Sequence, residues 1–166
     1  MKKDATYEAW NKEKLERRSR RLVSRFGDFR DVKSISKLSY DESYVVSKYY
    51  LVHELVKIGR PAIPSLLDAI RNKNYLVREL VVRTLAEIGD KSITPMLIGL
   101  LKMDEQRRVQ HGAIRALQKI NGINFTAQKR RSGRMQQEEV VRKWLNWWKE
   151  NKSLYDGLRT RHRCAV

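Results

Sequence analysis

A stretch of thirteen residues occurs three times in this sequence, and this repeat constrains the fold more than any other feature. Residues 47–59 align without gaps on residues 77–89, thirty positions later, and again on residues 109–121, which Gly122 follows. The copies share apolar residues at the three- and four-residue spacing of one helical face. These matching places are Leu51/Val81/Ala113, Val52/Val82/Ile114, Leu55/Leu85/Leu117 and Ile58/Ile88/Ile120. Each copy closes at glycine or Asn-Gly, which tolerate the positive φ that ends a helix, so the sequence predicts three equivalent helices.

Shorter apolar segments between these copies predict a second helix for each repeat. Residues 62–71 and 92–102 match each other, with Pro64 and Pro95 near the start, where proline disturbs a helix least. Residues 31–38 are predicted to form the first helix of an opening pair. A helical hairpin of this kind cannot bury its apolar side alone, whereas a stack of hairpins generates a continuous core. The predicted fold class is therefore all-α, an α-solenoid of about three helical hairpins.

Short motifs within the repeats carry a family resemblance. They are Ile63-Pro64-Ser65-Leu66-Leu67, Asn74-x-x-Val77-Arg78, Leu85-x-x-Ile88-Gly89-Asp90 and a partial copy from Asp104 to Ile120. The pattern resembles the HEAT repeat, in the short form first described in phycobilisome bilin lyases, and it covers residues 31–125. The first and third copies depart from it, because Ser47-Lys48 replaces Val-Arg and Gln110 replaces Arg. The resemblance implies a scaffold with a binding surface, and only occasionally an enzyme.

A tryptophan-rich segment follows the repeats. Residues 138–149 are predicted to form a helix with a wide apolar stripe. The stripe consists of Val140, Val141, Trp144, Leu145, Trp147 and Trp148. One interpretation is an aromatic platform that stacks on bases or grips a peptide. We favour the other, a helix that caps the open end of the solenoid, because the spacing is that of a core.

The N-terminal stretch predicts an amphipathic helix over residues 6–26. Leu15, Leu22, Val23 and Phe26 share one side of the helical wheel, which we expect to pack on the first repeat. The opposite side carries Lys14, Arg17, Arg18, Arg21 and Arg25. A basic amphipathic helix can also lie on an anionic membrane, but the apolar side here is short and Trp10 lies off it. We therefore rank membrane binding lower.

The net charge of +17 is concentrated at the two ends of the chain. Residues 1–30 and 126–166 hold 12 of these 17 net charges. We therefore divide the chain into a basic helix (1–30), the repeat solenoid (31–125), a basic loop with the capping helix (126–152) and a basic tail (153–166). The loop contains Lys129, Arg130, Arg131 and Arg134.

These basic arms suggest nucleic acid as the partner, with structured RNA within a larger complex favoured over DNA. No base-reading motif accompanies them, so phosphate contact is the expected interaction. The expected nucleic-acid-binding residues are Lys14, Arg17, Arg18, Arg21, Arg25, Lys129, Arg130, Arg131 and Arg134. The alternative partner is an acidic protein bound through a concave groove of the solenoid. The groove residues would be His53, Arg83, Arg115 and Lys119. Ordinary solvated side chains would explain either set without any ligand.

Signals for catalysis are poor. No phosphate-binding loop, nucleophile elbow or paired carboxylates occur, and His162 with Cys164 offers too few ligands for zinc. We therefore expect a binding protein that is not an enzyme and needs neither metal nor cofactor. The resemblance alone keeps a bilin-lyase-like enzyme or chaperone as a second alternative. The single cysteine and the lack of an apolar segment of about 20 residues favour a soluble, intracellular and cytoplasmic protein without a membrane span.

Overall fold

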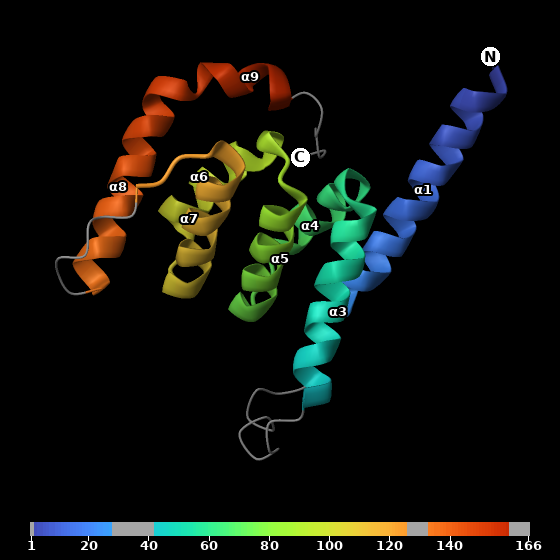
Figure 1. Ribbon diagram of the computed structural model, residues 1–166, viewed down its shortest axis with the longest axis horizontal. Helices are drawn as coiled ribbons and strands as arrows, with labels where there is room; N and C mark the ends of the chain where they lie inside the picture. Colours follow the sequence, from blue (N-terminus) through green and yellow to red (C-terminus); the bar gives the residue numbers. More distant parts are fainter. Residues whose placement is uncertain (1, 28–41, 126–132, 160–166) are drawn as a thin grey trace. The chain divides into compact units, whose positions relative to one another are not determined.

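A computed structural model describes residues 2–27, 42–125 and 133–159 of the chain (Figure 1). In these ranges it contains α-helices and short 3-10 turns and no β-strand, which confirms the all-α prediction. The helix predicted for residues 31–38 lies outside the described residues. Internal contacts divide the chain into two units, residues 1–84 and 85–166, which are described separately.

The first unit combines the N-terminal helix with the first repeat. It contains α1 (Lys2–Ser24), α3 (Glu42–Ile58), the 3-10 turn η1 (Arg60–Ala62), α4 (Ile63–Ala69) and most of α5 (Tyr75–Ile88). Helix α1 packs against α3, η1 and α4. The core of this unit includes the fully buried side chains of Phe26, Leu55 and Leu66. The predicted basic N-terminal helix is thus confirmed as a packed part of the fold.

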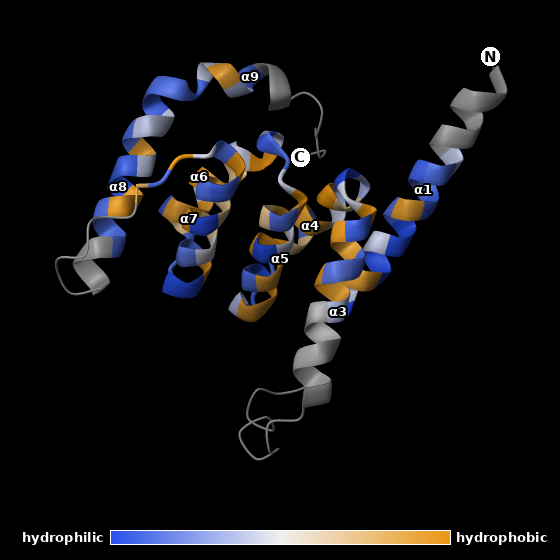
Figure 2. Ribbon diagram, viewed as in Figure 1, coloured by the Kyte–Doolittle hydropathy of each residue, from blue (hydrophilic) through white to orange (hydrophobic). Residues whose placement is uncertain are grey.

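The second unit contains the later repeats and the tryptophan-bearing helix. Its elements are the end of α5, η2 (Lys91–Ile93), α6 (Thr94–Met103), α7 (Arg107–Asn121), α8 (Gly133–Asn151) and α9 (Ser153–Arg159). Helix α6 packs along α7, and α8 contacts both of them. Apolar and polar residues alternate along each of these helices, as expected where one side of a helix is buried (Figure 2). Helix α8 is the predicted cap.

The three copies of the repeat agree at their central leucine and at the glycine that closes each helix. Leu55, Leu85 and Leu117 are each fully buried. The glycines that close the three helices, Gly59, Gly89 and Gly122, have φ angles of 72°, 75° and 70°. Such left-handed backbone is costly for any residue with a Cβ, so these glycines set the ends of α3, α5 and α7.

The second helix of each repeat starts later than the sequence predicts. A 3-10 turn precedes both α4 and α6, and Pro64 and Pro95 lie in the first turn of the α-helix that follows. In η2 the Asp90 carboxylate accepts a hydrogen bond from the Ser92 backbone N–H at 2.9 Å. The 3-10 turns therefore end inside the two segments that were predicted as α-helix, η1 at the first residue of one and η2 at the second residue of the other.

The arginine of the repeat motif fastens a helix to the loop before it. Arg78 Nη1 donates to the carbonyl oxygens of Asn72 and Lys73, at 2.7 and 3.1 Å. In the third copy Gln110 Nε2 donates to the carbonyl oxygen of Asp104 at 2.8 Å, again six residues upstream. Glutamine thus makes the corresponding bond to the loop where the motif lacks its arginine.

Candidate functional site

Helix α1 has an inner side that is built for packing. Ser19 and Val23 are buried, Leu15 and Leu22 are half-buried, and Phe26 is buried in the turn that follows the helix. The Ser19 hydroxyl donates to the carbonyl oxygen of Leu15 at 2.8 Å, so this buried polar group is satisfied within the helix. The apolar side found on the helical wheel is therefore the side that contacts the first repeat. None of the described helices, α1 included, is long and apolar enough to cross a membrane.

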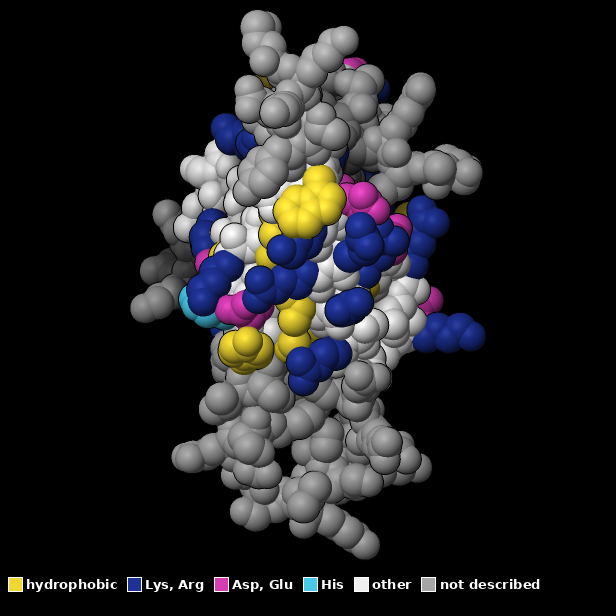
Figure 3. Space-filling model, turned by 90° about the vertical axis from the view of Figure 1, so that its right-hand side faces the viewer, with side chains coloured by type: hydrophobic (Ala, Val, Ile, Leu, Met, Phe, Trp, Pro, Cys, Tyr) yellow, Lys and Arg dark blue, Asp and Glu magenta, His cyan; other side chains and the backbone are white. Residues whose placement is uncertain are grey.

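The opposite side of α1 carries a row of exposed residues, here called the basic stripe and defined as Trp10, Lys14, Arg17 and Arg21. They recur every three or four residues, so they lie on one side of the helix, about 16 Å long at a rise of about 1.5 Å per residue. Arg25 is also exposed and lies in the turn that follows α1. Figure 3 views the side of the molecule that carries α1 and shows lysine and arginine side chains predominating on its described part.

The contacts within the basic stripe are weak surface interactions. Lys14 Nζ lies 5.0 Å from the centroid of the Trp10 ring, a cation–π contact. Arg17 Nη2 lies 3.1 Å from Glu13 Oε1, with both side chains 61% exposed. Exposed ion pairs of this kind contribute only about 0–1 kcal/mol, because solvent competes for both charges. These side chains can therefore exchange their present partners for others at little cost.

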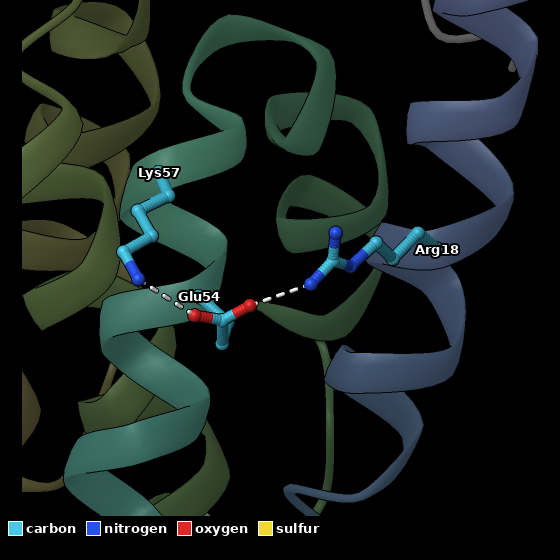
Figure 4. A network of polar contacts seen from close by, with 3 residues as sticks. All are labelled: Arg18, Glu54 and Lys57. Atoms are coloured by element: carbon cyan, nitrogen blue, oxygen red, sulfur yellow. Dashed lines mark hydrogen bonds and ion pairs between the residues drawn. The ribbon is translucent and has the colours of Figure 1, made fainter.

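Arg18 differs from its basic neighbours on α1, because it bonds to α3. Its Nη2 donates to Glu54 Oε2 at 2.5 Å, and Lys57 Nζ donates to Glu54 Oε1 at 3.1 Å (Figure 4). Glu54 is 8% exposed, so its carboxylate is largely removed from solvent and held between two cations. Arg18 thus anchors α1 to the first repeat. The sequence grouped Arg18 with the outward residues and gave no sign of Glu54 as its partner.

The pKa of Glu54 reflects this arrangement. The hydrogen bond from Lys57 lowers the pKa below its ordinary value of 4.5, with further help from the charges of Lys57, Arg18 and His53 and against the opposing effect of burial. Because the folded-state pKa is lowered, the carboxylate stabilises the fold at pH values above about 4.5. This stabilisation is lost as the pH falls through the folded-state pKa.

A Glu54→Gln variant is therefore expected to be less stable than the wild type at about pH 7, with the difference shrinking as the pH falls through the lowered pKa of Glu54. The measurement is the urea concentration at the midpoint of unfolding, at neutral and at acidic pH. Glu139→Gln is the matched control, since Glu139 pairs with Lys143 at 3.1 Å on the surface and should matter little. An equal loss for Glu54→Gln at both pH values would show that the ionised pair does not anchor α1.

The four residues predicted to line a groove are all exposed. Two of them lie in the first unit and two in the second. His53 and Arg83 lie on α3 and α5 in the first unit. Arg115 and Lys119 lie on α7 in the second, where Lys119 Nζ bonds to Glu87 Oε2 at 2.6 Å. The residues predicted for the basic loop, Lys129, Arg130 and Arg131, lie outside the described residues. Arg134 belongs to the first turn of α8, where no side chain is described.

An aromatic cluster packs α8 and α9 against the rest of the second unit. Trp144 is fully buried and packs edge-on against Phe125 and Trp147, with ring centroids 4.9 and 5.3 Å apart. The Tyr155 hydroxyl donates to Asn121 Oδ1 at 2.6 Å, and burial raises the pKa of Tyr155. The sequence identified the tryptophan stripe but missed Tyr155 and Asn121, which are 34 residues apart.

Comparison with known proteins agrees with this architecture. A family model described as HEAT repeats matches residues 33–127. The bilin biosynthesis protein RpcF of Synechococcus sp. (strain WH8020) is 39% identical over 69 residues, which amount to 42% of this chain and 33% of RpcF. The match thus spans about a third of the length of that relative. No solved structure matches the chain.

The similarity to RpcF corrects one expectation drawn from the sequence. We expected a protein that is not an enzyme, because no catalytic motif occurs in the chain. The relative is named for a role in bilin biosynthesis, and on this finding the expectation is wrong. The comparisons give no support to nucleic-acid binding, whereas the repeats themselves indicate a protein-interaction scaffold.

Proposed function

The chain belongs to the HEAT-repeat family, and from that premise we propose that it acts in bilin biosynthesis by binding a bilin-accepting protein through its repeat helices. The observation that carries the proposal is the 39% identity to a bilin biosynthesis protein over 69 residues. The scaffold role is supported by the repeats, since repeat helices carry exposed side chains at equivalent positions and such helices commonly bind protein partners.

Exposed cationic side chains on the repeat helices support this choice of partner. Arg83 in the first unit and Arg115 and Lys119 in the second are exposed. Arginine and lysine recognise carboxylates, arginine often through two parallel hydrogen bonds. Acidic side chains of a protein partner and the propionate groups of a bilin are both carboxylates. The exposed cations of these helices therefore suit a protein that binds both an acidic protein partner and a bilin.

The test mixes the purified chain with a purified apo-biliprotein and with biliverdin as an open-chain tetrapyrrole. We expect a complex on size-exclusion chromatography, and a bilin that remains on the biliprotein after denaturation if the chain also takes part in attachment. Arg115→Glu with Lys119→Glu should weaken the complex about tenfold or more, because charge reversal replaces attraction by repulsion. Lys91→Glu with Lys102→Glu, at exposed positions of η2 and α6, is the matched control and should leave the complex intact. No complex and no bilin transfer would contradict the proposal.

Binding of structured RNA by the basic arms stays a prediction. Its support is the concentration of 12 of the 17 net charges in residues 1–30 and 126–166. If about six of these side chains contact phosphates, the logarithm of the binding constant falls with the logarithm of salt at a slope near −4 to −5. Repeating the complex assay after nuclease treatment separates this hypothesis from protein binding, because only an RNA-bridged complex would be lost.

A further inference from the structure

The basic stripe of α1 has no role in the core of the first unit. Lys14, Arg17 and Arg21 point away from the side of α1 that buries Ser19 and Val23. Arg17 and Arg21 are four residues apart, where like charges on a helix repel each other. An anionic ligand lying along the stripe would relieve this repulsion. The stripe therefore has the character of a binding surface.

We propose that the basic stripe docks an acidic α-helix of a protein partner. The proposal goes beyond the function proposed above, which assigns partner contact to the repeat helices, and it would hold for any partner that presents such a helix. Trp10 would be the apolar anchor at one end of the contact, and Lys14, Arg17 and Arg21 would pair with carboxylates along it. Arg18 is not part of this surface, because it is engaged with Glu54.

The spacing of the charges matches a second helix. Cations that recur every three or four residues lie about 4.5–6 Å apart along the axis of α1. A partner helix with acidic residues at the same intervals has the same rise per residue, so its charges stay in register along the whole contact. Each guanidinium can hold a carboxylate through two hydrogen bonds, which fixes the orientation as well as the strength of the pairing.

Trp10 is 53% exposed, which is unusual for so large an apolar side chain. Tryptophan is enriched at protein interfaces, where its side chain fills a pocket of the partner and contributes much of the binding energy. Lys14 lies over its ring and contributes a charge beside the same contact. An amphipathic acidic helix offers both partners at once, with carboxylates for the cations and an apolar residue for the indole.

Glu13 favours a protein partner over a nucleic acid. Its side chain is 61% exposed and lies next to the stripe, with Oε1 3.1 Å from Arg17 Nη2. A phosphate backbone carries charge of one sign, so Glu13 would repel it wherever the two approach. A partner helix can place a lysine or arginine opposite Glu13, which turns the same carboxylate into a favourable contact.

The test measures fluorescence anisotropy with three probes at about 0.1 M salt, where exposed charges more than a Debye length apart are largely screened. The first probe is a helical peptide with glutamates on one face at intervals of three and four residues and a single leucine at one end. The second has the same composition with glutamates on all faces, and the third is a single-stranded RNA oligonucleotide. We expect the one-faced peptide to bind about tenfold tighter than the scrambled peptide, because only its charges match the stripe.

A triple variant Lys14→Gln, Arg17→Gln, Arg21→Gln is expected to lose this binding about tenfold or more, and Trp10→Ala to weaken it further. Lys91→Gln, Lys102→Gln, Lys149→Gln is the matched control, since it removes the same charge from exposed positions elsewhere and should keep the affinity. Thermal melts of both triple variants should match the wild type, because surface substitutions leave the core intact.

The outcomes separate the alternatives. Equal binding of the two peptides, or an equal loss in both triple variants, would overturn the proposal in favour of net charge alone. RNA binding that depends on the stripe while the one-faced peptide fails would assign the surface to nucleic acid instead. Failure of the biliprotein assay with success here would reject the proposed function and leave the acidic-helix site standing.

Discussion

A chain carrying Leu85→Asp is expected to lose its cooperative thermal transition. Leu85 is fully buried on α5, at the place that Leu55 and Leu117 hold in the other two copies of the repeat. The substitution removes a core side chain, which costs about 2–5 kcal/mol, and buries a carboxylate in an apolar core, which costs more. A single domain is stable by only about 5–15 kcal/mol, so the combined penalty approaches the whole stability.

The matched control for this prediction is Arg83→Asp, two positions away on the same helix. Arg83 is exposed, so the same side chain is introduced at a solvated position and the transition should remain. Far-ultraviolet circular dichroism during heating measures both. If Leu85→Asp melted as cooperatively as Arg83→Asp, α5 would not be part of the repeat core.

The repeat could be predicted because its signal is local and occurs three times. Leu55, Leu85 and Leu117 align without any knowledge of the fold, and a helix with one apolar side must bury that side against a neighbour. The 3-10 turns before α4 and α6 could not be placed in the same way. Proline near the start of a segment is compatible with either kind of helix. The sequence therefore predicts roughly where α4 and α6 begin, but not the residue at which the 3-10 turn gives way to the α-helix.

The contacts of α1 show where sequence reasoning stops. The helical wheel separates Leu15 from Arg17, because residues two positions apart lie on nearly opposite sides of an α-helix. Arg18 lies at the border between the two sides, and its role depends on which neighbour approaches that border. Glu54 is 36 residues away, and its proximity follows only from the packing of α1 on α3.

The error about enzymatic function has a different origin. Each known catalytic motif is a short sequence pattern that belongs to particular folds. A chain that lacks all of these patterns can still take part in catalysis. In a repeat protein the functional residues are spread over successive helices, so no single stretch of sequence displays them. Exposed residues such as Arg83 and Arg115 look like ordinary solvated side chains when each is read by itself.

Trp144→Ala is expected to lower the free energy of unfolding by about 3–5 kcal/mol. The Trp144 ring is fully buried and contacts Phe125 and Trp147 edge-on, so its removal leaves a large cavity beneath α8. Urea denaturation followed by circular dichroism measures the loss. Trp148→Ala is the control with the same chemical change, and it should cost clearly less, because Trp148 is only half-buried.

Trp144→Phe separates the packing of the indole from its polar atom. The buried Nε1 of Trp144 has no hydrogen-bond partner among the residues that the structure describes. Leaving such a donor unsatisfied costs about 1–3 kcal/mol, so phenylalanine removes that penalty while it gives up part of the packing. Trp144→Phe should therefore retain most of the stability that Trp144→Ala loses. If instead both variants kept full stability and lost affinity for a partner, Trp144 would belong to a binding platform and α8 would not be a cap.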